Sequence, residues 1–263
     1  MIYVSASRLS SHVSRIIQLF MNTTSPMVLM LGANADVAKA AIPLYIAKGY
    51  RVMAASRSTG ELQEFALKHN YSEQQMTVLY FDATAFESHQ AFYDMLPAKP
   101  NIVIYAAGFL KNNEEALHDF EGSFNMMKVH YCGAVSILNI IAMDAGNHHL
   151  ERIIGLSSLS GVRGRKSNFI YGSTKSAFTQ YLAGLRQYLF RRNIKVNVVV
   201  AGYIRSKMTA GLNLPESLML EPFFIAKAII HAGSSFIIVP GFKWKMIYHI
   251  LRLMPERLVA KLP

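Results

Sequence analysis

Short apolar runs alternate with longer amphipathic segments along most of this sequence. The apolar runs predict buried strands at residues 27–31, 51–55, 77–81, 102–105, 152–156, 195–200 and 236–239. The segments between them predict helices at 37–47, 61–69, 86–96, 114–145, 171–191 and 222–231, the long one broken near Gly122. Because the connections are short, this alternation predicts a single doubly wound α/β domain of the Rossmann type with a parallel seven-stranded sheet.

The two ends of the chain differ from its middle. Residues 1–26 are rich in serine and lack acids, so we expect a weakly structured N-terminal extension before a domain at 27–240. Residues 241–263 predict a basic amphipathic helical tail. Its residues Trp244, Ile247, Leu251 and Met254 share one helical face, and a basic face lies beside them, a pattern typical of a helix in a membrane interface. A tail that packs across a neighbouring subunit is the alternative.

The formal net charge is +11, and much of it lies at the chain ends. This distribution disfavours a broad nucleic-acid surface, so we expect no nucleic-acid partner and a local anionic surface or partner instead. The single cysteine indicates a reducing compartment. No apolar stretch approaches the roughly 18 to 20 residues of a spanning helix, so we expect a cytoplasmic protein, with the inner membrane face as a contact for the tail. No metal site is expected, because His148 and His149 are adjacent and lack an acidic ligand cluster.

A turn of small residues follows the first predicted strand and opens a helix. Gly32, Asn34, Asp36 and Val37 fall in this turn, where a strand, a tight turn and a helix form a phosphate-binding geometry. Only Gly32 of the usual glycines is present, with Asp36 and Ala38 at the other two positions. We expect Asp36 to cap the helix and its carboxylate to point away from a pyrophosphate.

The second predicted strand is followed by an arginine instead of an acid. NAD-binding folds usually place an acid there to hold the ribose 2′-hydroxyl, and residues 54–58 contain none. Arg57 is available for a 2′-phosphate. The sequence therefore favours NADP(H) over NAD(H), with a solvated turn arginine as the alternative.

Small or acidic residues also end the third and fourth predicted strands. Asp82 and Ala83 follow the third strand, and Ala106, Ala107 and Gly108 follow the fourth. An aspartate at the first position commonly borders an adenine pocket in such folds. Small residues at the second position suit a cofactor that lies across the strand ends.

Three polar residues near the fifth strand predict proton-transfer chemistry. Tyr171 and Lys175 are four residues apart, so on a helix their side chains point into the same cleft. An ammonium beside a phenol favours the phenolate, so we expect the pKa of Tyr171 to fall from about 10 and the residue to exchange a proton near neutral pH. Ser158 lies at the carboxyl end of a strand, where open α/β sheets bind ligands.

With the glycine turn and the residues named above in one order, the chain resembles the short-chain dehydrogenases/reductases over residues 27–240. The resemblance implies that Tyr171 exchanges the proton and that Ser158 holds the substrate oxygen. It also implies that Lys175 binds the nicotinamide ribose and lowers the tyrosine pKa. By the same resemblance, Gly202 belongs to the cofactor site, and Ile204 and Ser206 border the nicotinamide and the phosphates.

The chain departs from the family pattern at two further positions. Ala201 replaces the usual proline before Gly202. His130 stands where the family usually has the asparagine of its catalytic tetrad, which holds a helix distortion and a proton-relay water. Either His130 takes over this role in catalysis, or it is a satisfied histidine inside a helix.

A narrower similarity concerns residues 163–168, 207–212 and 244–261, which resemble keto-sugar reductases of polysaccharide or lipid-linked sugar synthesis, such as the decaprenylphosphoryl-ribose 2-keto reductases. It implies an NADPH-dependent ketoreductase with a small-molecule or lipid-linked sugar substrate. The family resemblance also implies a homo-oligomer. The competing hypotheses are a catalytically weak cofactor-binding regulator and a membrane-surface interaction protein on the same fold.

Overall fold

A computed structural model describes residues 25–261, so the expectation of a weakly structured 1–26 extension lies almost wholly outside the described residues. Seven strands form one sheet, all of them parallel to their neighbours. They are β1 (Met27–Leu31), β2 (Arg51–Ser56), β3 (Met76–Tyr80), β4 (Ile102–Tyr105), β5 (Arg152–Ser158), β6 (Lys195–Ala201) and β7 (Ile237–Ile238). The predicted parallel seven-stranded sheet is confirmed, and the last strand is shorter than expected.

The strand order β3-β2-β1-β4-β5-β6-β7 reverses direction between β1 and β4. Val28 pairs with Val52 of β2 on one side and with Ile102 of β4 on the other. At such a reversal the chain leaves the two strands in opposite directions, which opens a crevice at their carboxyl ends. This crevice is where the predicted cofactor residues converge.

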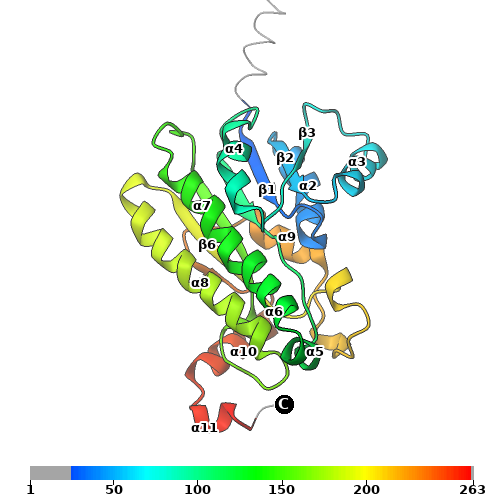
Figure 1. The fold of residues 1–263 in the computed structure, drawn as a ribbon, viewed down its shortest axis with the longest axis vertical. Coiled ribbons are helices and arrows are strands. Elements are labelled where there is room, and N and C mark those ends of the chain that lie inside the picture. The colour runs from blue at the N-terminus through cyan, green and yellow to red at the C-terminus, as the bar shows by residue number, and fades with distance from the viewer. Residues whose placement is uncertain (1–24, 262–263) are drawn as a thin grey trace, which may run out of the picture.

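Helices cover both faces of the sheet (Figure 1). They are α2 (Asp36–Ala47), α3 (Thr59–Lys68), α4 (His89–Asp94), α5 (Asn113–His118), α6 (Phe120–Met127), α7 (Gly133–Met143), α8 (Phe169–Leu189), α9 (Pro222–Ile230), α10 (Phe242–Leu253) and α11 (Glu256–Val259). Helices α2, α3 and α9 pack on one face, and α4, α7 and α8 on the other. The single doubly wound domain predicted from the alternation is confirmed.

Strand β1 illustrates why the sequence builds this core. All five of its residues are buried, and their side chains alternate between the two faces. Leu29 and Leu31 join the core under α7 and α8, whereas Val28 and Met30 join the core under α2 and α9. A strand buried on both faces must be apolar at every position, which explains the continuous apolar runs in the sequence.

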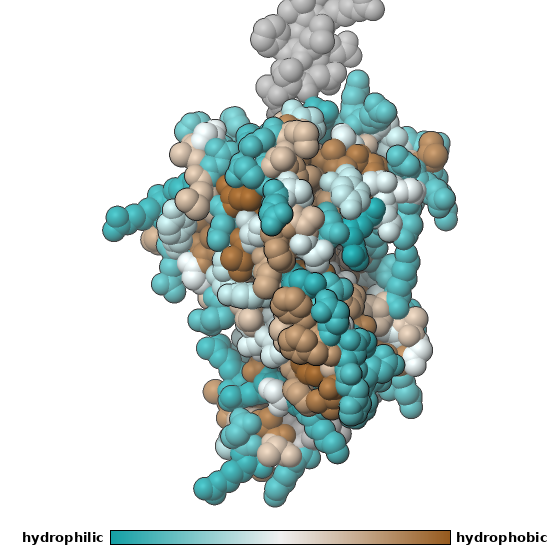
Figure 2. Space-filling model, in the orientation of Figure 1, coloured by the Kyte–Doolittle hydropathy of each residue, from teal (hydrophilic) through white to brown (hydrophobic). Residues whose placement is uncertain are grey.

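The long helical region after β4 is broken near Gly122, as expected, and has a second irregularity further along. The break lies at Asp119, whose carboxylate accepts a hydrogen bond from the Gly122 amide at 3.0 Å and caps α6. The helix then passes through a π-helical turn at Lys128–Cys132 (η2) before α7 begins. Figure 2 shows apolar surface over α5 and α6, where Phe120 and Phe124 are exposed.

One helical stretch corrects the expectation that no segment is long enough to span a membrane. The 24 residues of Phe120–Met143 meet that length and composition, yet half of the most apolar 18-residue window in this stretch is buried inside the domain. The core helix of a soluble fold has the same properties, because it is apolar toward the sheet.

The C-terminal tail packs onto the domain at the carboxyl edge of the sheet, beneath the start of α8 (Figure 1). Trp244, Tyr248 and Leu251 of α10 are buried, and Ile247 is half-buried. This corrects the expectation that the stripe of Trp244, Ile247, Leu251 and Met254 faces a membrane, since Met254 is half-buried as well. An amphipathic pattern shows that one face is buried, and here the domain itself buries it.

Candidate active site

Ser158, Tyr171 and Lys175 meet at the carboxyl end of β5. Ser158 ends the strand, and the short 3-10 helix Leu159–Gly161 leads to the loop before α8, whose first turn carries Tyr171. The Lys175 ammonium donates to the Leu156 carbonyl at 3.1 Å and lies 5.9 Å from the centre of the Tyr171 ring. The predicted constellation of the three side chains is thus assembled.

Two glycines allow the first turn of α8 to approach β5 closely. A Cβ atom on Gly172 would lie 2.5 Å from the Ser160 carbonyl oxygen, and one on Gly161 would lie 2.8 Å from the Ser176 nitrogen. Real Cβ atoms do not come this close to backbone. The glycine after Tyr171 therefore sets how near the phenol comes to Ser158.

The proton affinities of Tyr171 and Lys175 differ from the sequence-based expectation. Burial raises the pKa of Tyr171 to about 12, and its hydrogen bond with Ser158 lowers that pKa only in part. Burial also lowers the pKa of Lys175 to about 8. The predicted fall in the tyrosine pKa is therefore wrong for the protein alone, because desolvation of the phenolate raises the pKa more than the Ser158 hydrogen bond lowers it.

His130 is fully buried in the π-helical turn, and both of its ring nitrogens have protein partners. Nε2 accepts from the Phe109 amide at 3.0 Å, which places the proton of the neutral ring on Nδ1, 2.7 Å from the Thr174 hydroxyl. That hydroxyl donates to the Tyr171 carbonyl at 2.7 Å. The geometry thus favours a positioning role, because His130 joins the β4 loop to the first turn of α8 and has no nitrogen left for a relay water.

We expect His130→Asn to make the protein less sensitive to acid. Burial and the Lys175 charge hold the pKa of His130 well below its usual 6.5, so only the unfolded chain takes up this proton as the pH falls through 6.5. The wild type then loses stability by up to about 1.4 kcal/mol per pH unit through this group. Urea unfolding between pH 7 and pH 5 should show a shallower decline for His130→Asn.

The exposed His148 provides the matched control, and His148→Asn should keep the wild-type slope. Buried His89, whose pKa burial also lowers, is present in all three proteins and leaves part of the slope in each. Parallel slopes for His130→Asn and the wild type would contradict a neutral buried His130.

The turn after β1 fits tightly against the end of β4. Gly32 has a φ of +84°, and a Cβ atom there would lie 2.4 Å from the Ala107 nitrogen. Asn34 Nδ2 donates to the Ser56 hydroxyl at 3.0 Å and to the Ser58 carbonyl at 2.7 Å, while its buried Oδ1 has no partner. The turn is thus fixed to the ends of β2 and β4, where a cofactor would lie.

Asp36 does not cap α2, which corrects the sequence-based expectation. The N-cap position is Ala35, and no side chain caps this helix end. Asp36 lies in the first turn, where its carboxylate accepts from the Lys207 amide at 2.7 Å. The negative charge of Asp36 therefore points to the loop after β6. The backbone amides in the first turn of α2, around buried Val37, have no side-chain acceptor.

Arg57 is exposed at the end of β2, and none of the described side chains forms a hydrogen bond or an ion pair with it. Glu61, in the helix that follows, forms its ion pairs with Lys39 at 3.2 Å and with Lys207 at 2.9 Å instead. The guanidinium is therefore free to bind an anion at this edge.

Asp82 is held by its own turn at the end of β3. Its Oδ1 accepts from the Thr84 amide and the Thr84 hydroxyl, both at 2.8 Å. Next to it, a Cβ atom on Gly133 would lie 2.1 Å from the Ala83 carbonyl oxygen, so α7 can begin only with a glycine here. A side chain at Gly108 would also be crowded, since its Cβ atom would lie 3.0 Å from His130 Nε2.

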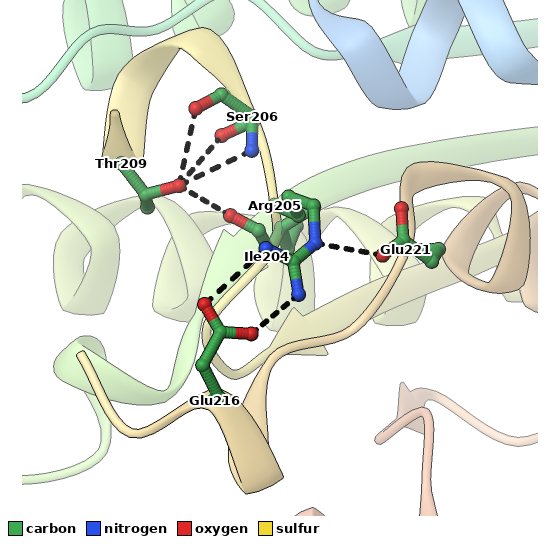
Figure 3. A network of polar contacts seen from close by, with 6 residues as sticks. All are labelled: Ile204, Arg205, Ser206, Thr209, Glu216 and Glu221. Carbon is green, nitrogen blue, oxygen red and sulfur yellow. Dashed lines mark hydrogen bonds and ion pairs between the residues drawn. The ribbon is translucent and has the colours of Figure 1, made fainter. Parts of the chain in front are cut away.

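The loop after β6 has its own polar network (Figure 3). Arg205 forms ion pairs with Glu216 at 2.6 Å and with Glu221 at 2.8 Å, which ties the two ends of the loop together. Thr209 hydrogen-bonds to the Ile204 carbonyl and to Ser206, forming a capping box. Ile204 and Ser206 are thus held in place, and the Lys207 contacts with Asp36 and Glu61 bring this loop to the first turns of α2 and α3.

A cavity of about 240 Å³ opens beside Ser158. It is lined by Ser158, Leu159, Ser160, Arg165, Gly202, Tyr203, Trp244, Ile247 and Leu251. A Cβ atom on Gly202 would lie 2.1 Å from the Trp244 indole, whose Nε1 donates to the Leu218 carbonyl at 2.9 Å. Gly202 therefore makes room for Trp244, and α10 forms one wall of the cavity.

Sequence reasoning missed Thr174, Arg165 and the role of Trp244. A signal existed for Thr174, which lies three residues after Tyr171 on the same helix. The contacts of Trp244 with Gly202 and Leu218 join segments far apart in the chain and leave no local pattern. Within 25–261, no three metal-binding side chains of the His, Cys, Asp or Glu types cluster together.

A family model described as short chain dehydrogenase matches residues 26–217. An uncharacterized oxidoreductase of Staphylococcus aureus (strain USA300) is 25% identical over 217 residues, covering 80% of this chain and 91% of that protein. An uncharacterized oxidoreductase of Streptomyces coelicolor is 27% identical over 243 residues, covering 89% of this chain and 95% of that protein.

Solved structures share the fold. A short chain dehydrogenase of Burkholderia cenocepacia in complex with NADP has a TM-score of 0.76 at 19% identity, covering 89% of this chain and 95% of that chain. The protein ElxO with NADP bound has a TM-score of 0.75 at 16% identity, covering 85% of this chain and 100% of that chain. At these identities the likeness establishes the fold.

Proposed function

Because the chain belongs to the short-chain dehydrogenase family and is an oxidoreductase of that type, we propose that it reduces a ketone with NADPH and that Tyr171 donates the proton. The observation that carries this proposal is the meeting of Ser158, Tyr171 and Lys175 beside a cavity at the carboxyl end of β5. When bound, the nicotinamide would supply the hydride. The proton and the groups that orient the substrate would come from side chains of the protein itself.

The site residues have distinct roles in this reaction. Ser158 lines the cavity and can donate its hydroxyl to the carbonyl oxygen, which positions that oxygen near the phenol. Tyr171, with a pKa of about 12, is protonated at neutral pH and so can act as the acid that neutralises the developing alkoxide. Lys175 lies close enough to stabilise the phenolate that remains.

The residues near the β1–β4 crevice fit a dinucleotide. The uncapped amides at the start of α2 can bind a pyrophosphate. Asp82, Ala83, Ala107 and Gly108 would border the adenosine and nicotinamide halves, and Ile204 and Ser206 would close the site from the loop. The NADP complexes among similar structures support the same cofactor.

Arg57→Ala should weaken NADPH binding roughly 10- to 100-fold and leave NADH binding nearly unchanged. The unpaired guanidinium can bind the 2′-phosphate through charge-assisted hydrogen bonds, and NADH lacks that phosphate. Fluorescence titration of both cofactors gives the two affinities. Lys48→Ala removes an exposed charge at the far end of α2 and is the matched control. Equal wild-type affinity for NADPH and NADH would contradict the preference.

The proposed substrate is a keto-sugar, free or lipid-linked. The sequence resemblance to keto-sugar reductases supports this class, and the cavity offers hydroxyls on Ser158, Ser160 and Tyr203 opposite an apolar wall from α10. Sugar hydroxyls would form hydrogen bonds with these three side chains, and the face of a sugar ring or an aliphatic chain would pack on the apolar wall. The direct test is NADPH oxidation over a panel of keto-sugars and simple ketones. A preference for apolar ketones would contradict the sugar assignment.

A second proposed function is attachment to an anionic membrane surface through the outer face of α10. Although the predicted stripe is buried, Phe242, Met246, Ile250 and Leu253 form another apolar stripe that is exposed, with spacings of four, four and three. Exposed Lys245, His249 and Arg252 flank it. Figure 2 shows apolar and hydrophilic surface intermixed at this end of the molecule. Such a helix suits a bilayer interface.

We expect the protein to co-sediment with liposomes that contain anionic lipid and to dissociate as salt rises, since each basic residue contributes roughly 1 kcal/mol near such a surface. The double variant Met246→Glu and Ile250→Glu should lose most of this binding. Leu67→Glu, at an exposed apolar position on α3, should keep it. If the wild type ignores anionic liposomes at low salt, the stripe is a contact between subunits instead, which sedimentation velocity would reveal.

A further inference from the structure

The cavity beside Ser158 contains a single charged side chain, that of Arg165. The other lining residues are apolar or carry hydroxyls, and α10 closes the cavity with Trp244, Ile247 and Leu251. A guanidinium at the wall of so small a space is costly to desolvate unless an anion or several acceptors pair with it. The partners of Arg165 therefore indicate what the cavity is built to bind.

Arg165 has few partners within the protein. Its Nη2 lies 3.4 Å from the Ser160 hydroxyl, a long hydrogen bond, and its Nε is buried without any partner. No carboxylate among the described residues forms an ion pair with it. Within residues 25–261, the positive charge at this wall therefore has no counter-charge.

Arg163, the other arginine of the same loop, has a structural role. Arg163, two residues earlier, donates from Nε to the Leu251 carbonyl and from Nη2 to the Arg252 carbonyl, both at 3.0 Å. It thereby satisfies the free carbonyls at the end of α10 and fixes that helix over the cavity. Arg163 supports the structure, whereas Arg165 has no comparable contact.

Ser160 adds a second donor at the same place. Its Oγ accepts from Asn168 Nδ2 at 2.9 Å and from Arg165, so its own hydrogen remains free to donate. Its backbone amide donates to Ser158 Oγ at 3.2 Å, which joins it to the residue that would hold the reacting carbonyl. Two donors thus lie in the same cavity as the position of the carbonyl oxygen.

We propose that Arg165 and Ser160 form an anion subsite and that the substrate carries a carboxylate or phosphate group on the same fragment as its carbonyl. The planar guanidinium suits both groups, because each offers two oxygens to its fork of N–H donors. This inference rests on the proposed function insofar as the cavity receives the carbonyl substrate. It goes further by specifying that the substrate is negatively charged and that Arg165 and Ser160 bind the charged group.

The kinetic test compares matched ketones, one bearing a phosphate or carboxylate and one bearing a neutral hydroxyl or amide in its place. The wild type should favour a charged member of each pair. Arg165→Met should lower kcat/KM for the charged member roughly tenfold more than for the neutral one, mainly through KM, and Arg165→Lys should fall between. The phosphate and carboxylate series separate the two kinds of anion.

Lys166→Met is the matched control, because the neighbouring Lys166 is exposed and its loss changes the net charge equally. Calorimetric titration with inorganic phosphate needs no turnover, and binding should weaken in Arg165→Met alone. Weaker phosphate binding by Arg165→Met supports the subsite even if the protein reduces no ketone. A lack of ketone reduction would count against the proposed function only. Equal phosphate binding in all three proteins, or equal kinetic losses for charged and neutral ketones, would overturn the subsite.

Discussion

Tyr171→Phe is expected to lower turnover by about 10²- to 10⁴-fold while cofactor binding stays nearly intact. The ring would keep its edge-to-face packing on His130, at 5.4 Å and 89°, so the first turn of α8 should be undisturbed. Only the hydroxyl that delivers the proton is lost, together with its hydrogen bond to Ser158. Stopped-flow absorbance of the nicotinamide measures turnover, and fluorescence titration measures binding.

Tyr181 offers a matched control on the same helix. Its hydroxyl donates to Asn139 at 2.8 Å, away from the cavity, so Tyr181→Phe should keep wild-type turnover. More than a tenth of wild-type activity in Tyr171→Phe would contradict the assignment of the proton donor. A parallel loss of cofactor binding would mean instead that the phenol holds the site together.

Trp244→Ala should destabilise the protein by about 3–5 kcal/mol and raise KM for the substrate. Trp244 is 5% exposed, lies against Gly202 and packs edge-on against Tyr203 at 5.1 Å. Its loss would leave a hole where α10 meets the domain, so one wall of the cavity would loosen. Urea unfolding measures the stability, and initial rates measure KM.

Two further variants make this result specific. Trp244→Phe keeps most of the packing and loses the hydrogen bond to Leu218, so it should cost about 1 kcal/mol. Phe242→Ala, at a position 76% exposed on the same helix, should change the stability by less than about 0.5 kcal/mol. Equal effects of Trp244→Ala and Phe242→Ala would contradict the docking of α10.

The sheet and its order of elements followed from the sequence because each depends on a local pattern. A strand buried on both faces needs an unbroken apolar run, as β1 and β4 have, and a helix packed on one face needs apolar residues at helical spacing. The Tyr171 and Lys175 pair was also predictable, since a spacing of four fixes their relation on any helix.

Features set by burial were not predictable in this way. Helix α10 has two apolar stripes, and the sequence does not say which one meets the domain. The pKa of Tyr171 depends on how much water the fold removes, and the partner of Asp36 lies 171 residues away. For His130, the choice between a catalytic and a positioning role required knowing what both ring nitrogens contact.

The position of Trp244 gives this protein an intrinsic optical probe. It is the only tryptophan in the sequence, and it lies in the wall of the substrate cavity, against Gly202. Its emission therefore reports on this one location, free of background from other indoles. Undocking of α10 should shift the emission to longer wavelength as water reaches the ring. Reduced nicotinamide absorbs where tryptophan emits, so cofactor arrival should quench the signal by energy transfer, and a substrate filling the cavity should change it again.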